Sequence, residues 1–364
     1  MIVKTITQLI ESFAPLSLQE SYDNSGLIVG DADLEISGVL ITIDVNEEVI
    51  EEAIEKSCNL IISHHPLIFS GLKRLTGENE VQRCVKMAIK NDIAIYAAHT
   101  NIDNVLNGVN GKIAEKIGLK NISVLQHKSD LLMKLVTYVP KIHAFSIREA
   151  LFNAGAGHIG NYDFCSFNVE GIGTFRGNLD AKPFVGEINQ FHSEPEIRLE
   201  MIFPEYLKNK LIDTLLNVHP YEEPAYDIIA LQNNSNKTGS GLIGELTVEE
   251  DEIVFLNRIK KVFGCSVIRH TNLTGKKIKK ISVCGGSGSM FLNEAIRMNA
   301  DVFISADFKY HDFFNAEKKI IIVDLGHYES EQFTKDIFYE IITKKMPTFA
   351  VQISEIKTNP INYL

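Results

Sequence analysis

Two adjacent histidines, His64 and His65, stand in the segment Ser63-His64-His65-Pro66. They follow Leu60-Ile61-Ile62, an apolar run that predicts a buried strand of a parallel sheet. Folds of the α/β class bind their ligands at the carboxyl ends of such strands. Neighbouring side chains on an extended strand point to opposite sides, so two metal ions that each take one histidine fit this pair more easily than one ion does. The alternative interpretation is a pair of ordinary surface histidines.

Two further segments place metal-ligand residue types after predicted strands. The strand predicted over residues 93–98 runs into His99 and Asp103, and Asp is a standard oxygen ligand. The strand predicted over residues 319–326 leads into His327 and Glu331, which are four residues apart and share one helical face. The alternative for Asp103 is a cap or Asx-turn. For the other pair it is a first-turn carboxylate, Glu331, that answers the helix dipole, with His327 as a capping histidine.

These candidate ligands share one kind of position, since each follows the carboxyl end of a predicted strand: His64, His65, Asp103, His327 and Glu331. In a parallel sheet those ends lie at one edge, so we expect the side chains to converge. Five nitrogen and oxygen ligands suit a centre of two divalent metal ions with one bridging carboxylate. The set contains no thiolate, which leaves zinc, iron, manganese and cobalt as candidate metals.

The elements that must hold these residues alternate between helix and strand. Helices predicted over 4–14, 46–56 and 81–90 are interleaved with strands over 39–44, 60–62 and 93–98, which predicts the α/β class with a mainly parallel sheet. The order in the middle of the chain is β-α-β-β-α-β, the pattern of an inserted ferredoxin-like α+β domain. We therefore expect residues 1–129 and 234–364 to form two parts of a metal-binding domain, and residues 130–233 to form the insert.

Two other stretches allow a ligand site but have a simpler interpretation. Gly285-Gly286-Ser287-Gly288-Ser289 follows a predicted strand and precedes a predicted helix, a geometry that can cradle an anion. It lacks the GxGxxG pattern and a Walker lysine, so a tight turn is favoured. The loop from His219 to Glu223 is either another ligand site or a structural turn, and the turn is again favoured.

The composition and the net charge indicate which kinds of protein and partner are expected. The chain has 364 residues, of which 45% are hydrophobic and 23% charged, as is ordinary for a soluble globular protein. The formal net charge of -11 argues against nucleic acid as a partner. The five scattered cysteines contain no CxxC, so we expect a reducing, cytoplasmic location. The first residues form no signal peptide and no apolar run reaches membrane-spanning length, so we expect no membrane partner.

Several motifs resemble the signatures of the dinuclear-metal proteins labelled GTP cyclohydrolase 1 type 2 homologues. The matching stretches lie at residues 63–69, 99–103 and 326–331, with two more at 23–27 and 309–312. The resemblance covers nearly the whole chain, and one departure is Tyr22, where the family usually has Trp. It implies metal ligation by the five candidates above, with Glu331 as the bridge.

The same resemblance carries expectations about assembly. It implies a toroidal homohexamer whose metal sites face an internal cavity. The long-form members of the family carry a middle insert similar to trimeric signalling proteins of the ferredoxin-like type, and residues 130–233 match that insert. Two divalent metal ions are therefore expected in each subunit of a self-associating ring.

The first functional hypothesis is a dinuclear metal-dependent hydrolase that acts on a nucleotide or other small molecule. One version is a GTP cyclohydrolase I-type reaction, which converts GTP to dihydroneopterin triphosphate plus formate through a metal-activated hydroxide. His99 is a candidate proton shuttle and His311 a second one, with a structural role as the alternative for both. The same site would serve a two-metal phosphoesterase. A second hypothesis is a non-enzymatic metal-binding scaffold or regulatory protein.

Overall fold

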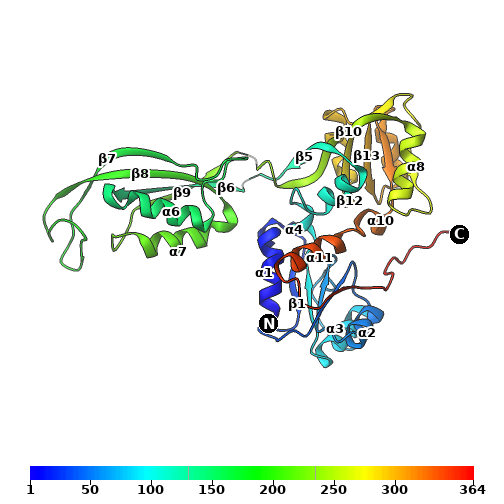
Figure 1. Cartoon of the computed structure of the whole chain (residues 1–364), viewed down its shortest axis with the longest axis horizontal. Coiled ribbons are helices and arrows are strands. Elements are labelled where there is room, and N and C mark those ends of the chain that lie inside the picture. The colour runs from blue at the N-terminus through cyan, green and yellow to red at the C-terminus, as the bar shows by residue number, and fades with distance from the viewer. Residues whose placement is uncertain (130, 234) are drawn as a thin grey trace. The chain divides into compact units, whose positions relative to one another are not determined.

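The chain divides into two compact units in the computed structural model, which describes residues 1–129, 131–233 and 235–364 (Figure 1). The first, here called the split unit, joins Met1–His127 to Lys237–Leu364. The second, the inserted unit, is Lys128–Asn236. The architecture is mixed α/β with several sheets. The predicted domain boundaries at residues 130 and 234 lie outside the described residues.

The first sheet of the split unit is mainly parallel. Its order is β1-β4-β3-β2-β15, and every pair except β1–β4 is parallel. The strands are β1 (Gly26–Val29), β2 (Val39–Thr42), β3 (Leu60–Ser63), β4 (Ala94–Ala97) and β15 (Val351–Ile353). Every residue of β2, β3 and β4 is buried, as expected for short apolar strands covered on both faces.

The second sheet of the split unit is mixed. Its order is β11-β14-β13-β12-β10-β5, and only β12–β13 and β13–β14 are parallel pairs. The strands are β5 (Lys120–His127), β10 (Gly239–Asp251), β11 (Arg269–His270), β12 (Lys277–Ser287), β13 (Val302–Ala306) and β14 (Ile321–Asp324). The expectation that all candidate ligands share one sheet edge is therefore wrong. An apolar run identifies a strand, but it does not say which strand will be its neighbour.

Helices cover the two faces of the first sheet. One face packs on α2 (Glu47–Glu55) and α3 (Glu80–Lys90), the other on α1 (Val3–Phe13) and α11 (Thr334–Lys345). The helices α2 and α3 each begin at an asparagine whose side chain accepts a backbone N–H of the first turn. The remaining helices of this unit are α4 (Thr100–Asp103), α5 (Val109–Ile117), α8 (Glu252–Val262), α9 (Leu292–Arg297) and α10 (His327–Glu331).

One hydrophobic core joins the two sheets. Ile41 and Ile62 of the first sheet belong to the same buried cluster as Ile304 and Val323 of the second. Burying apolar surface from both sheets in one cluster stabilises their packing against each other. This shared core explains how strand ends from two different sheets can supply one site.

The inserted unit has the predicted order of elements. It runs β6 (Leu132–Pro140), α6 (Ala144–Ala154), β7 (Phe167–Phe175), β8 (His192–Pro204), α7 (Lys208–Val218) and β9 (Tyr226–Leu231). All pairs of its β7-β8-β6-β9 sheet are antiparallel, and both helices lie on one face of that sheet (Figure 1). A core that includes Leu135, Leu151 and Leu211 fills the space between them.

Two strands of the split unit border the insertion. His127 at the end of β5 is the register partner of Gly239 at the start of β10, and the two strands are antiparallel neighbours. The chain therefore leaves the split unit and returns to it at adjacent positions.

Three further findings bear on the sequence-based expectations. The Gly-rich segment is not a tight turn, because β12 continues through Gly285 and Gly286 to Ser287. All five cysteines are free. Among the described residues, no helix has the length and apolar character needed to cross a membrane.

Candidate metal centre

The structure brings all five predicted metal ligands together. His64 and His65 directly follow β3, Asp103 ends α4 just after β4, and α10 carries His327 and Glu331 at its two ends after β14. Their ligand atoms, with those of His99, form three groups in which the atoms lie within 4.8 Å of one another: His64, His65 and His99; His65, His327 and Glu331; and His64, Asp103 and Glu331. Two of the groups share Glu331.

The carboxylate of Glu331 lies at the centre of this cluster. Its Oε2 atom is 3.0 Å from Nε2 of His65, 3.1 Å from Nε2 of His327 and 3.6 Å from Nε2 of His64. The residue is buried, with 3% of its surface exposed. One carboxylate thus faces histidines from two different sheets, which is the position that a bridging ligand needs.

The histidines are oriented by oxygen acceptors at their other ring nitrogen. Nδ1 of His64 donates to the carbonyl of Ala98 at 2.9 Å. Nδ1 of His65 donates to Asp44 at 2.7 Å, and Nδ1 of His327 donates to Asp307 at 2.6 Å. A ring that keeps its proton on Nδ1 presents the lone pair of Nε2 in its neutral form, as a metal ligand must.

His99 lies at the edge of the same cluster. Its ring centre is 5.3 Å from the rings of both His64 and His65, and its Nδ1 contacts Asp23 at 2.7 Å. Asp23 also accepts hydrogen bonds from Thr100, so it is fixed in place. His99 is thus positioned to act either as a ligand or as a proton carrier. The structure does not bring His311 into any of the three groups; that residue is exposed, and its ring lies against Tyr310.

The charged groups of the cluster shift one another's pKa values. Burial, with the charge of Glu331, raises the pKa of Asp103 to about 7. Burial opposes protonation of His65, but its bonds to Asp44 and Glu331 raise its pKa to about 10. Burial would likewise raise the pKa of Glu331, yet the neighbouring histidines hold it well below its usual value. The carboxylates that attract protons to these histidines favour a divalent cation for the same electrostatic reason.

Two buried atoms of the cluster fit a metal cation. Nε2 of His64 and Oδ1 of Asp103 are buried, lie 3.8 Å apart and have no hydrogen-bond partner among the described residues. Leaving such groups unpaired costs about 1–3 kcal/mol each. A cation between them would satisfy both atoms. Imidazole nitrogens and carboxylate oxygens fit zinc, iron, manganese or cobalt.

Several supporting residues were not identified from the sequence. Asp44 and Asp307 stand at or just past the ends of predicted strands, the signal used for the histidines, and could have been found by it. Asn110 could not, because its role is tertiary: it accepts the N–H of Gly285 at 2.9 Å and donates to the carbonyl of Asp103 at 3.1 Å. Near the end of the chain, Thr358 donates to the second oxygen of Asp44 at 2.7 Å.

Removing one of these supports should weaken metal binding without removing a ligand. We expect Asp44→Ala to lower the affinity for zinc about 10–100-fold, because the ring of His65 would lose the acceptor that orients it. Isothermal titration calorimetry on chelator-treated protein measures this. Asp213→Ala, an exposed aspartate on α7, is the control and should bind zinc as the unaltered protein does. Equal affinity in both variants would show that Asp44 does not orient the ligand.

Comparisons with known proteins place the whole chain among relatives. The profile of the family described as Duf34/NIF3 (NGG1p interacting factor 3) matches residues 1–360. A Halalkalibacterium halodurans protein named GTP cyclohydrolase 1 type 2 homolog is 38% identical over 370 residues, covering 99% of this chain and 98% of that protein. A Bacillus subtilis protein of the same name is 38% identical over 369 residues, with the same coverage.

A solved structure extends the similarity to the fold. The crystal structure of a Bacillus cereus protein related to NIF3 is similar with a TM-score of 0.87 and 37% sequence identity. The match covers 100% of this chain and 99% of the other. Both units of the chain therefore have counterparts in that protein.

Proposed function

The chain belongs to the Duf34/NIF3 family, and we propose that its His/Asp/Glu cluster binds two divalent metal ions that support hydrolysis of a small molecule. The observation that carries the proposal is the position of Glu331, whose Oε2 faces His64, His65 and His327 from within 3.6 Å. A single buried carboxylate surrounded in this way is suited to bridge two ions.

Each ion would have its own set of ligands. His64, Asp103 and Glu331 would hold one, and His65, His327 and Glu331 would hold the other, following the two groups that share Glu331. Bound divalent ions supply Lewis-acid polarisation and acidify water at neutral pH. Asp44 and Asp307 would keep the rings of His65 and His327 in the binding orientation.

His99 is the residue proposed to move the proton. Its Nδ1 is held by Asp23, which leaves Nε2 as the ring nitrogen that can exchange a proton with a reacting group. His311 is not proposed for this step, since it is exposed and belongs to none of the ligand groups.

Aromatic side chains next to His99 support a substrate with a flat ring. Phe69 has its ring centre 6.2 Å from that of His99, and Tyr22 lies 6.5 Å from Phe69. Both aromatic residues are more than half exposed, so their faces are open to a ligand. Bases stack on such rings, and each stacked ring contributes about 1–3 kcal/mol. Because the relatives are named GTP cyclohydrolase 1 type 2 homolog, GTP is the first substrate to test.

The expected assembly and location form part of the same proposal. We propose a homohexameric ring in the cytoplasm, supported by the family resemblance and by five free cysteines. Native mass spectrometry of the metal-loaded protein measures the assembly. A monomer or dimer at micromolar concentration would contradict the ring.

The activity itself is tested by metal-dependent turnover. Chelator-treated protein is reloaded separately with zinc, iron(II), manganese or cobalt and incubated with GTP, while pterin fluorescence and formate are followed. We expect product with at least one metal and none with the chelated protein or with His65→Ala. Metal-loaded protein that binds two ions tightly but turns over neither GTP nor a panel of other small-molecule esters and amides would favour the non-enzymatic hypothesis.

His99→Gln separates the two roles that its position allows. If His99 carries the proton, the variant should keep two metal ions and lose about 10²–10⁴-fold in kcat, the range typical of general acid–base catalysis. Metal content by mass spectrometry and kcat on the same sample measure both quantities. Loss of one ion from the variant would instead identify His99 as a ligand.

A further inference from the structure

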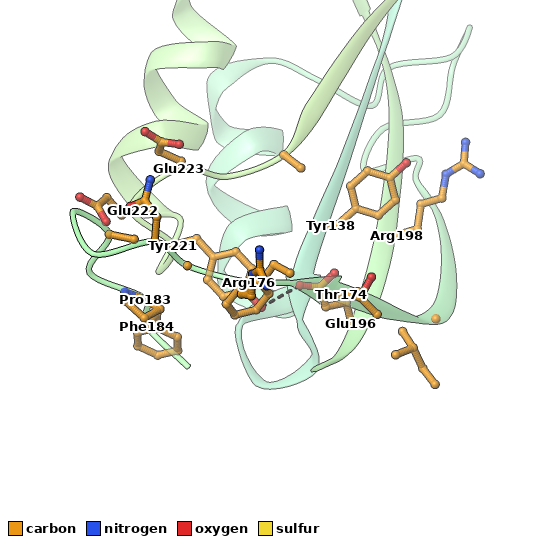
Figure 2. Close-up of a pocket in the computed structure, with 18 of the residues that line it drawn as sticks. Tyr138, Thr174, Arg176, Pro183, Phe184, Glu196, Arg198, Tyr221, Glu222 and Glu223 are labelled. Atoms are coloured by element: carbon orange, nitrogen blue, oxygen red, sulfur yellow. Dashed lines mark hydrogen bonds between the residues drawn. The ribbon is translucent and has the colours of Figure 1, made fainter. Parts of the chain in front are cut away.

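The inserted unit contains a pocket that the metal chemistry does not use. Its volume is about 780 Å³, within the range of small-molecule sites, and only residues of the inserted unit line it (Figure 2). The walls come from β7 and the loop that follows it, from β8, from the loop between α7 and β9, and from Tyr138 of β6. No residue of the predicted metal centre belongs to this unit.

A buried carboxylate is the main polar feature of the lining. Glu196 on β8 is 9% exposed, and its Oε1 accepts the hydroxyl of Tyr221 at 2.7 Å (Figure 2). Gly173 lies against the same carboxylate: a Cβ atom there would be 2.1 Å from Oε2 of Glu196. Tyr221 and the bare backbone of Gly173 therefore fix the carboxylate in place. Among the described residues, no Lys, Arg or His forms an ion pair with Glu196.

Aromatic rings stand beside this carboxylate. The ring of Tyr221 lies 6.4 Å from Phe175 and 6.3 Å from Phe184 in tilted arrangements, and all three residues are at least partly exposed. The quadrupole of an aromatic ring attracts an ammonium or guanidinium group that lies over its face. The rings also offer apolar surface to the body of a ligand.

The charge of the lining favours a cation over an anion. Its charged residues are the carboxylates Glu170, Asp180, Glu196, Glu222 and Glu223 and the cations Arg176 and Arg198. Arg198 is paired with Glu200 at 2.9 Å, and Lys141 pairs with Glu170 at 2.7 Å. Arg176 is exposed, whereas Glu196 is buried, so the least hydrated charge in the pocket is negative. An unpaired buried carboxylate is costly, and a bound cation offsets that cost.

His219 supports the pocket but does not point a ligand atom into it. Its Nε2–H donates to the carbonyl of Tyr138 at 3.1 Å, and its Nδ1 accepts the N–H of Tyr221 at 3.1 Å. Burial lowers the pKa of His219, which keeps the ring neutral. The predicted turn at His219 therefore serves to hold Tyr221 beside Glu196, while Glu222 and Glu223 of the same loop reach the lining.

We propose that this pocket binds a small organic cation: a protonated amine or quaternary ammonium whose charge lies at Glu196 and whose apolar body packs on Phe175, Phe184 and Tyr221. The chemistry is that of an aromatic-walled cation site with one buried counter-charge.

Three probes of similar shape and different charge test the proposal. Phenethylamine carries the ammonium group, 2-phenylethanol is its neutral counterpart and 3-phenylpropionate carries the opposite charge. Each is titrated by calorimetry into the full-length protein after chelator treatment, so that the amine cannot coordinate a metal. We expect the amine to bind at least about tenfold more tightly than either of the others, since a hydrogen bond between charged partners is stronger than one between neutral groups.

Matched variants assign the binding to the pocket. Glu196→Gln keeps the shape of the side chain and removes its charge, so phenethylamine should lose at least about tenfold in affinity. Glu149→Gln, an exposed glutamate on α6, is the control and should bind as the unaltered protein does. Preferred binding of the anion, equal amine affinity in both variants, or no binding of any probe would each overturn the proposal. The probe comparison uses unaltered protein and decides the question if Glu196→Gln does not fold.

Discussion

A Glu331→Gln variant is expected to lose at least about a hundredfold in affinity for divalent metal ions and to retain fewer than two ions per chain. The carboxylate of Glu331 belongs to two of the three ligand groups, so both of the proposed ions would lose an anionic ligand at once. Substitutions at residues that only support a ligand cost about 10–100-fold, and loss of the shared ligand should exceed that range. Metal content by mass spectrometry and zinc titration by calorimetry measure the two quantities.

The neighbouring Glu329 provides a control on the same helix. Its side chain accepts a hydrogen bond from Asn359 at 2.9 Å and belongs to none of the ligand groups. Glu329→Gln should therefore bind two ions with unchanged affinity. If Glu331→Gln still retained two ions at the affinity of Glu329→Gln, the bridging role of Glu331 would be wrong.

Gly286→Ala is expected to damage both stability and metal binding. A Cβ atom at this position would lie 2.2 Å from Oε1 of Glu331 and 3.3 Å from Nε2 of His327. The backbone has φ of +60°, which adds about 1–2 kcal/mol for a residue with a side chain. The new Cβ atom would also overlap Oε1 of Glu331. Together the two effects should lower the free energy of unfolding by about 3 kcal/mol or more and weaken zinc binding.

The steric part of that loss can be separated from the backbone part. Gly264 has nearly the same backbone angle, with φ of +63°, but a Cβ atom there would meet nothing within 4 Å. Gly264→Ala should lose only the backbone cost of about 1–2 kcal/mol and keep full metal affinity. Denaturant unfolding of the metal-free proteins and zinc titration give both comparisons. Similar losses of stability and affinity in the two variants would show that Glu331 does not need the absence of a side chain at Gly286.

The positions of the candidate ligands could be predicted because they depend on local patterns. Short apolar runs predict buried strands, and polar residues at the carboxyl ends of those runs are candidates for a site. That reasoning applied to His64, Asp103 and His327, which the structure brings into the same cluster. It applies equally to Asp44 and Asp307, which were overlooked because a carboxylate at a strand end also has an ordinary role in turns.

The remaining features depend on tertiary structure. No local pattern shows that β3 and β14 lie in different sheets that share a core. Nor does the segment Gly285-Gly286 reveal its role: it resembles a phosphate-binding turn, yet it is a strand whose missing side chain at Gly286 leaves space for Glu331. The pocket around Glu196 depends on a contact with Tyr221, 25 residues further along the chain.

The pairing of His127 with Gly239 has an evolutionary consequence. The strands β5 and β10 of the split unit are antiparallel neighbours, and the inserted unit stands where the loop of a hairpin would join them. Loop-closure entropy grows slowly with loop length, so a long insertion at this joint destabilises the host sheet little. Every candidate metal ligand lies outside the interval between these two residues. A lineage can therefore gain, lose or remodel the inserted domain without altering a metal ligand, and selection can act on the cation pocket and the metal centre separately.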